Sequence, residues 1–357
     1  MVLSLNQILL DIAAGEPHGT LSPRLLFRID LPVEIDVRDD TGRRPIFFLP
    51  DLHILSSERA DGYGEYFNLN HHREELLKHL LSRLVELRST EQEYLQLRLF
   101  QLGDFHDLWR ESEHWWWDED VRSMIQRQVD SHRDLFDILS ELDTERLVGN
   151  HDNRLRRPSE LEKLQDEEIA EYFPADRIYP DLQSFCWGIA HRVDLIHADR
   201  FDKVETGAFH FLNPIGARLA QHGSINIGEV DEWQHELEPP GYPDGQADSG
   251  LLEENIDYSD TGIAEAKKKY YAETRDYVRI LENIDSRYRD YPSVAAVIGH
   301  THSPRIVSDH ASPSFSLIDC GSWVNVSSAV GDPADLFWNA QLGVVTGNEI
   351  GVVQIGG

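Results

Sequence analysis

The residues of this chain that could do chemistry are aspartate, asparagine and histidine, and they gather just after short apolar segments. The run SVAAVI leads into the sequence GHTH, which places His300 and His302 two positions apart. The run PIFFLP leads in the same way into Asp51 and His53. Side chains two positions apart on an extended backbone face the same way. Each pair could therefore hold a metal ion between its two side chains.

Three further apolar segments end in the same manner. LRLFQL leads into Gly-Asp104, ERLV leads into a glycine followed by Asn150, and VDLI leads into His197. In open α/β sheets, ligands bind at the carboxyl ends of the strands. A glycine before the ligand lets the backbone turn sharply and come close to an ion. Five strand ends that carry Asp, Asn and His therefore predict one shared site.

The donor types indicate the kind of metal. Carboxylate, amide and imidazole groups without cysteine suit Mn, Fe, Zn or Mg. There are enough side chains for two ions, and a pair of ions ~3.5–4 Å apart is the spacing used for in-line phosphoryl displacement. Such a pair lowers the pKa of a bridging water, which then supplies hydroxide as the nucleophile. We expect two divalent ions, with Mn as the first choice and Fe, Zn or Mg as alternatives.

Each of these residues also has an ordinary explanation. Histidines in a loop can be exposed and idle, an aspartate after a strand can form an Asx-turn, and an aspartate before a helix can cap it. Asn150 could be a turn residue, and His197 could be a core histidine. The repeated position after apolar segments, in five places along the chain, favours the ligand interpretation.

The ordered motifs D-x-H, G-D, G-N-H-D, a single His and G-H-x-H resemble those of the calcineurin-like metallophosphoesterases, and they span most of the chain. The resemblance implies three ligands for one ion, three for the other, and one bridging carboxylate. These are Asp51, His53 and His302 for the first ion, Asn150, His197 and His300 for the second, and Asp104 for the bridge.

The resemblance also implies catalytic roles for residues around the third motif. His151 would not be a ligand but would protonate the leaving oxygen or stabilise the transition state, and Asp152 would orient it. Three arginines follow, of which Arg154 is nearest to His151. An arginine there could grip a phosphate with two hydrogen bonds. Ion pairs with the acidic surface are the alternative for these arginines.

A narrower resemblance concerns the UDP-2,3-diacylglucosamine diphosphatases, which cleave a pyrophosphate in lipid A synthesis. It rests on GDFHDLW, on HAD after the fourth strand and on DCGSW after GHTH. Members of that branch carry a helical lid between the fourth and fifth motifs, and the segment at about 201–291 occupies that place here. His106, Asp107 and Trp109, within GDFHDLW, could be structural or functional.

Strands and helices alternate along most of the chain, which suggests a layered α/β sandwich. We expect a hairpin from 33–38 and 43–49, helices over 71–87, 121–142 and 159–173, and a last hairpin in LGVVTGNEIGVVQI. The fold class is then α/β, a four-layer α/β/β/α metallophosphoesterase sandwich with an inserted, partly helical lid. Residues 1–44 would form an N-terminal β extension and residues 45–357 the metallophosphoesterase domain.

The charge of the chain limits its partners. It has 33 basic and 64 acidic residues, which gives a formal net charge of −31. Such a surface repels nucleic acid backbones and anionic lipid. We therefore expect a small phosphorylated substrate and no long nucleic acid, while a peripheral lipid substrate stays open. No transmembrane segment is expected, because no stretch is apolar over about 18 residues.

The cysteine count and the N-terminus bear on location. Two cysteines cannot build a disulfide framework, and the first residues lack the basic region of a secretion signal. We expect a cytoplasmic protein, and the sequence leaves its oligomeric state open.

The predicted function is hydrolysis of a small phosphodiester or pyrophosphate, such as a nucleotide-linked one, with a metal-bridging hydroxide as the nucleophile. The alternatives are a non-catalytic scaffold of the same fold, a phosphomonoesterase or protein phosphatase, or a nuclease. A scaffold of this kind typically loses ligands or the leaving-group histidine, and every one of these residues is present here.

Overall fold

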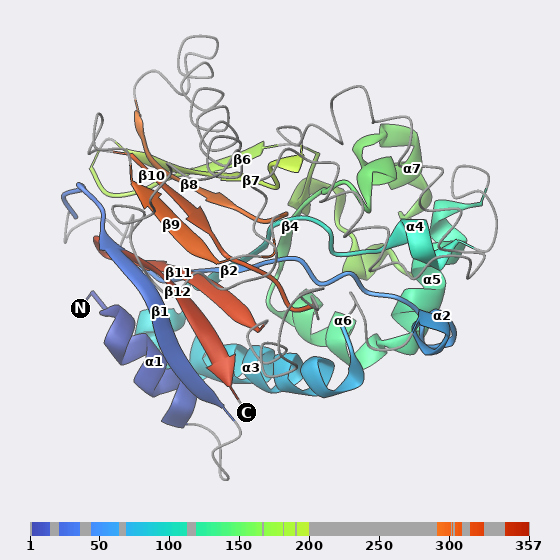
Figure 1. The fold of residues 1–357 in the computed structure, drawn as a ribbon, viewed down its shortest axis with the longest axis horizontal. Helices are drawn as coiled ribbons and strands as arrows, with labels where there is room; N and C mark the ends of the chain where they lie inside the picture. The colour runs from blue at the N-terminus through green and yellow to red at the C-terminus, as the bar shows by residue number, and fades with distance from the viewer. Residues whose placement is uncertain are drawn as a thin grey trace, which may run out of the picture.

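Two mixed β-sheets form the centre of the molecule, and the computed structural model shows them stacked beside a group of helices (Figure 1). The first sheet has seven strands in the order β1-β12-β11-β2-β3-β4-β5, and the second has five in the order β6-β7-β8-β10-β9. The structure describes residues 2–14, 21–35, 44–63, 69–112, 119–165, 168–180, 182–189, 191–199, 291–300, 302, 304–308, 315–324 and 340–356.

The strands of the first sheet are longest at its antiparallel end and become shorter toward β5. Those of the first sheet are β1 (Ser22–Asp30), β2 (Ile46–Leu49), β3 (Arg98–Gln101), β4 (Glu145–Leu147), β5 (Ile178–Tyr179), β11 (Gln341–Thr346) and β12 (Glu349–Gly356). Those of the second are β6 (Leu182–Cys186), β7 (Arg192–Ile196), β8 (Ser293–Ile298), β9 (Arg305–Ser308) and β10 (Ser316–Asp319). Strands β2 to β5 run parallel to one another, and β7, β8 and β10 do so in the second sheet.

Alternation along β2 explains why this strand lies between two apolar layers. Phe47 and Leu49 belong to the core on the helix side of the sheet, whereas Ile46 and Phe48 belong to the core shared with the second sheet. Successive side chains of a strand point to opposite faces, and all four are buried. A strand covered on both faces reads as a continuous apolar run, as IFFL does.

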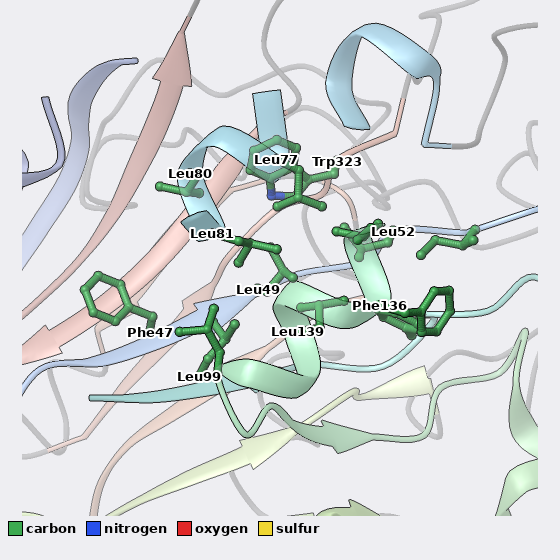
Figure 2. Packing of buried hydrophobic residues seen from close by; sticks show 14 of the residues in the cluster. Phe47, Leu49, Leu52, Leu77, Leu80, Leu81, Leu99, Phe136, Leu139 and Trp323 are labelled. Atoms are coloured by element: carbon green, nitrogen blue, oxygen red, sulfur yellow. The ribbon is translucent and has the colours of Figure 1, made fainter. Parts of the chain in front are cut away.

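Helices cover the outer face of the first sheet. The helices of the described part are α1 (Leu5–Ala14), α2 (Ser57–Tyr63), α3 (His71–Thr90), α4 (Leu108–Glu111), α5 (Val121–Ser131), α6 (Arg133–Glu141) and α7 (Pro158–Lys163). Short 3-10 helices occupy Gln92–Tyr94, Asn153–Arg156, Ala170–Tyr172 and Ala175–Arg177. Figure 2 shows leucines of α3 and Leu139 of α6 beside Leu49 of the sheet, in one apolar cluster with Phe47, Leu99 and Phe136.

Helix α3 is the longest of these helices and confirms the sequence prediction in its place. Leu77, Leu80, Leu81 and Leu84 recur at helical spacing and are fully buried. The helix begins after Asn70, whose side chain accepts a hydrogen bond from the backbone N–H of Arg73 at 3.0 Å. The apolar face and the cap together account for the start and the direction of this helix.

The helix expected over 121–142 is in fact two helices, α5 and α6. The chain leaves helical geometry at His132, which has φ −129° and ψ 32°. The Nε2 atom of His132 lies 2.6 Å from the Leu55 carbonyl oxygen, and its Nδ1 lies 3.0 Å from a carboxylate oxygen of Glu74. These contacts hold His132 at the bend. The helix expected over 159–173 is also shorter, because α7 ends at Lys163.

The hairpin expected from 33–38 and 43–49 is not formed by its described residues, 33–35 and 44–49, while residues 36–43 lie outside the described part of the chain. Both edges of β2 are occupied, by β3 in parallel and by β11 in antiparallel orientation. The N-terminal part of the chain instead contributes α1 and strand β1, which pairs antiparallel with β12. The last hairpin, β11 with β12, is confirmed.

The described residues form three layers: helices, the first sheet and the second sheet. Apolar side chains also cover the outer face of the second sheet, where Ile196, Ile298 and Leu317 are buried. The expected lid at about 201–291 falls, except for Tyr291, outside the described residues. Among the described helices, none is both long enough and apolar enough to cross a membrane.

Candidate metal centre

Loops that follow five parallel strands, three in the first sheet and two in the second, meet at one end of the two sheets. The predicted ligands come directly after these strands. They are Asp51 after β2, Asp104 after β3, Asn150 after β4, His197 after β7 and His300 after β8, with His53 and His302 two positions beyond the first and the last. The arrangement of the strands therefore brings these segments together at the carboxyl ends of the strands, as the sequence predicts.

A first group of side chains comprises Asp51, His53 and His302. Asp51 Oδ2 lies 3.0 Å from His302 Nε2, which lies 3.3 Å from His53 Nε2. All three residues are buried. One ligand atom from each lies within 4.8 Å of the other two, a spacing that could hold a metal ion.

A second group comprises Asp104, His197 and His300, and it satisfies the same criterion. Asn150 belongs to this group by contact, because its Oδ1 lies 3.1 Å from His197 Nε2 and 3.1 Å from His300 Nδ1. Every ligand assigned to the second ion by sequence thus lies against another member of the group.

Asp104 lies between the two groups. Its Oδ2 is 3.2 Å from His197 Nε2 in the second group and 3.7 Å from His53 Nε2 in the first. Its Oδ1 accepts a hydrogen bond from the backbone N–H of His151 at 2.8 Å. This is the position that a bridging carboxylate would take.

The proton positions of His197 test whether these residues fit a cation. His197 Nδ1 lies 2.9 Å from the Leu102 carbonyl oxygen, so a neutral ring carries its proton there. Its Nε2 then faces Asn150 Oδ1 and Asp104 Oδ2. Without a metal ion, Asp104 and Asp51 hold a second proton on the ring at Nε2, because they raise the pKa of His197 to about 10. A divalent metal ion can take the place of this proton among the same oxygen atoms, so the donors fit such an ion.

Asp51 supports the same conclusion. Its Oδ1 is buried and has no hydrogen-bond partner among the described residues. A buried carboxylate oxygen without a donor is costly, and a metal ion is one way to satisfy it. His53 is oriented for binding as well, because its Nδ1 lies 3.2 Å from Asp107 Oδ2 and its Nε2 is left to face the first group.

Burial and charge shift the pKa values of the two groups. Burial opposes the charge of His197, but Asp104 and Asp51 outweigh it and raise the pKa of His197 to about 10. Burial raises the pKa of Asp51 to about 6. Burial, helped by the charge of His151, lowers the pKa of His53 to about 4 and keeps its ring neutral at pH 7. The site thus places neutral and charged donors side by side and attracts positive charge.

The glycines before the ligands are required because side chains of other ligands lie against their Cα atoms. A Cβ atom on Gly149 would lie 2.1 Å from Asp104 Oδ1, and one on Gly103 would lie 2.4 Å from His197 Nδ1. Gly103 also has φ +107°, which side-chain-bearing residues rarely adopt. Glycine in these motifs therefore makes room for a ligand that belongs to a different motif.

Four of the predicted ligands have left-handed backbone geometry. They are His53, Asp104, His300 and His302, with φ between 47° and 76°. Such conformations cost of order 1–3 kcal/mol each and cluster at functional sites. The strained residues therefore lie where the five loops meet, which is typical of a functional site.

The same geometry corrects the argument from the spacing of His300 and His302. That argument assumed an extended segment, in which both rings would face one ion. His300 has φ 76° and His302 has φ 55°, so the backbone is not extended there. The two rings lie in different groups, His300 with Asn150 and His302 with Asp51. Asp51 and His53, the other such pair, do lie in one group.

His151 lies beside the first group without belonging to either proposed ligand set. Its ring meets the His53 ring edge-on, with centroids 4.5 Å apart. Its Nδ1 lies 3.1 Å from Asp107 Oδ2, and its face stacks on Trp109 with centroids 4.2 Å apart and planes 23° from parallel.

The contact expected between Asp152 and the His151 ring is not made. Asp152 Oδ1 accepts from the backbone N–H of Gly149 at 2.6 Å, and its Oδ2 accepts from Phe105 and His106 at 3.1 and 3.4 Å. Asp152 therefore ties the third motif to the loop that carries Asp104. Burial, reinforced by the charge of Asp104, raises the pKa of Asp152 to about 7.

Arg154 also differs from its expected role. It is buried, and its guanidinium donates to the Glu119 carbonyl oxygen at 2.7 Å and to Glu160 Oε1 at 3.1 Å. The ion pair with Glu160 is the alternative that the sequence had left open. A neighbour, Arg156, donates to both oxygens of Asp199 at 2.9 and 2.8 Å.

The sequence left Asp107 open, and the structure places it at the site. One oxygen, Oδ2, contacts His53 Nδ1, His151 Nδ1 and, at 2.7 Å, the Nε of Arg110. Burial would raise the pKa of Asp107, but Arg110 and His151 outweigh it and hold that pKa well below its usual range. The position of Asp107, three residues after the bridging Asp104, was the available signal.

His106, left open as well, belongs to the core. Its Nδ1 lies 2.5 Å from Gln128 Oε1, and its ring packs beside Phe136 and Phe173. Burial, together with the charge of Arg146, lowers the pKa of His106 to about 3. The ring is neutral and takes no part in either group.

Neither a known protein-family model nor a curated protein matches this chain. The solved structures to which it is similar include the crystal structure of a conserved uncharacterized protein, a predicted phosphoesterase, from Streptococcus pneumoniae TIGR4. The two chains are 10% identical, the match covers 85% of this chain and 82% of the other, and the TM-score is 0.28. A likeness this weak leaves the geometry of the two groups as the basis for a function.

Proposed function

We propose that this chain is a dinuclear-metal-dependent phosphoesterase that hydrolyses a small phosphodiester or pyrophosphate. The observation that carries the proposal is the meeting of two ligand groups at Asp104, whose Oδ2 lies 3.2 Å from a histidine of one and 3.7 Å from a histidine of the other. Two divalent ions held by these groups would stabilise charge on phosphate oxygens and generate hydroxide from water near neutral pH.

The chain's own residues have separate tasks in this proposal. Asp51, His53 and His302 hold one ion, Asn150, His197 and His300 hold the other, and Asp104 bridges them. His151, whose Nδ1 faces Asp107, keeps Nε2 on the far side of its ring to give a proton to the leaving oxygen. Asp152 fixes the backbone that carries Asn150 and His151, because it accepts hydrogen bonds from Gly149 and from the Asp104 loop.

The charge of the chain supports a small substrate. A net charge of −31 opposes binding along a nucleic acid backbone, whereas a compact phosphate can be held by the ions themselves. We further propose the four-layer α/β/β/α sandwich over residues 45–357, with Mn as the preferred metal. A lid at about 201–291 is a proposal of the same kind.

Hydrolysis of bis(p-nitrophenyl) phosphate with added Mn²⁺ tests the proposal. The wild-type chain should turn the ester over and bind two ions per chain in calorimetry. Asp104→Asn should remove nearly all turnover, by roughly 10²-fold or more, since it deletes a bridging charge and a metal ligand. Asparagine tolerates the left-handed backbone at this position, where φ is 48°.

Asp143→Asn is the matched control. Asp143 is also an aspartate with a left-handed backbone, φ 55°, but it lies away from both groups and pairs with Arg88 and Arg177. Its substitution should leave turnover unchanged. No turnover by the wild-type chain with any of the four metals, or equal turnover by Asp104→Asn, would sink the proposal.

A further inference from the structure

We propose that Trp109 is a positioning residue for His151, and that its indole holds the imidazole in the orientation needed to protonate a leaving group. The two rings are stacked, with centroids 4.2 Å apart and planes 23° from parallel. Trp109 is 3% exposed and His151 4% exposed, so water does not compete for either face. This inference rests on the proposed function, in which His151 supplies the proton.

The stack restricts a rotation of the His151 ring that its contact with Asp107 leaves open. The contact of His151 Nδ1 with Asp107 Oδ2, at 3.1 Å, sets the direction of one ring edge. The ring could still turn about the line of that contact, which would swing Nε2 away from the reacting phosphate. An aromatic plane against its face opposes this rotation, and stacked aromatic pairs contribute about 0.5–1.5 kcal/mol beyond burial.

Helix α4 is built to hold the indole in place. Asp107 begins this helix, and its Oδ1 accepts from the backbone N–H of Arg110 at 3.0 Å. The N–H of Leu108 donates to the His151 carbonyl oxygen at 3.2 Å, so a backbone hydrogen bond ties His151 to the residue before Trp109.

The far end of α4 is anchored too. Glu111 is fully buried, and its carboxylate accepts from the backbone and side chain of Ser56 and from Arg127. With both ends fixed, the helix gives Trp109 little freedom to follow a turning imidazole.

The role predicts a dependence on the leaving group. A p-nitrophenolate leaves readily as an anion, whereas a phenolate, whose conjugate acid has a pKa near 10 as in tyrosine, gains much more from a proton. Misplacing His151 should therefore harm hydrolysis of diphenyl phosphate far more than hydrolysis of bis(p-nitrophenyl) phosphate. General acid catalysis typically contributes about 10²–10⁴-fold, so partial misplacement is measurable.

Steady-state kinetics of Trp109→Leu and Trp109→Phe with Mn²⁺ on both esters test the inference. Trp109→Leu should lower kcat on diphenyl phosphate about tenfold or more and on the nitrophenyl ester about twofold or less. Trp109→Phe keeps a flat ring and should recover most of the loss. The control is Trp187→Phe, a tryptophan of equal burial that donates to the Gly347 carbonyl oxygen at the opposite end of the first sheet.

NMR of histidine-labelled wild-type protein gives a readout that needs neither a variant of Trp109 nor turnover. The ring protons of His151, identified by their absence in His151→Gln, should be shifted upfield by the indole face. An equal loss on both esters in Trp109→Leu, or unshifted His151 protons, would overturn the positioning role while leaving the phosphoesterase intact. An inactive wild type would remove the proposed function as well.

Discussion

At the scale of single residues, Gly149 gives the sharpest test of how the site is packed. A Cβ there would lie 2.1 Å from Asp104 Oδ1 and 2.5 Å from the Asp104 backbone nitrogen. Gly149→Ala should therefore displace the bridging carboxylate and weaken Mn²⁺ binding by about 10–100-fold, the usual effect of disturbing the support of a ligand. Isothermal calorimetry measures the change.

Gly356→Ala serves as the control for Gly149→Ala. A Cβ on Gly356 would come no closer than 3.3 Å to another atom, and the residue ends strand β12. The Gly356→Ala protein should bind Mn²⁺ with the same affinity as the wild type. A folded Gly149→Ala protein with unchanged affinity would show that Asp104 is not held where the structure places it.

The identities of the ligands could be predicted from sequence because each follows a recognisable strand, but their supports could not. Asp107 contacts His53, His151 and Arg110 through one oxygen. Its position three residues after Asp104 was a signal, but it does not reveal which side chains that oxygen contacts. The resemblance implied that Asp152 orients the His151 ring, but its two oxygens accept hydrogen bonds from backbone N–H groups instead.

At the scale of elements, a buried ion pair joins α3 to the break between α5 and α6. Burial alone would lower the pKa of His132, but the hydrogen bond and charge of Glu74 outweigh it and raise that pKa. Burial would likewise raise the pKa of Glu74, but His132 outweighs it and lowers that pKa. The ordinary unfolded values are about 6.5 and 4.3.

These shifts predict how stability depends on pH. The contribution of His132 is complete below about 6.5 and is lost as the pH rises through its folded pKa, while that of Glu74 is lost as the pH falls below about 4.3. Glu74→Gln should thus lower the free energy of unfolding by about 1 kcal/mol at pH 6 and by less at pH 9. Urea unfolding at the two pH values measures this.

Glu75→Gln, the adjacent residue of α3, is the comparison for Glu74→Gln. Its side chain is 45% exposed and pairs only with Lys78 among the described residues. The small change that Glu75→Gln causes in the free energy of unfolding should be the same at both pH values. A Glu74→Gln effect that did not shrink at pH 9 would mean that His132 is not charged in the folded chain.

The elements differ in how far the sequence predicts them, for physical reasons. Helix α3 and the β11–β12 hairpin depend on local periodicity and on a near turn, and both were predicted. The pairing of β1 with β12 joins residues such as Ser22 and Gly356, and no local pattern encodes so distant a partner. The break at His132 depends on Glu74 and Leu55, which also lie far from it in sequence.

At the scale of the whole molecule, negative charge acts in two places: over the surface and in the buried metal site. The net charge of −31 destabilises the compact state by self-repulsion, and salt relieves it by screening. The metal site concentrates part of that negative charge in a buried place, where Asp51 and Asp104 lie among histidines and bulk salt screens poorly. Divalent ions and ordinary salt should therefore stabilise the protein in different ways.

Thermal unfolding with Mn²⁺ separates the two effects. Each ion bound only by the folded chain adds about 2.7 kcal/mol when its free concentration is a hundredfold its Kd. Mn²⁺ should raise the Tm above the value in NaCl of equal ionic strength, and EDTA should reverse the rise. Asp104→Asn should lose most of the Mn²⁺-specific part and keep the salt part, whereas Asp143→Asn should keep both. Equal rises with Mn²⁺ and NaCl would mean that the cation acts on the surface charge and that the two ligand groups bind no metal.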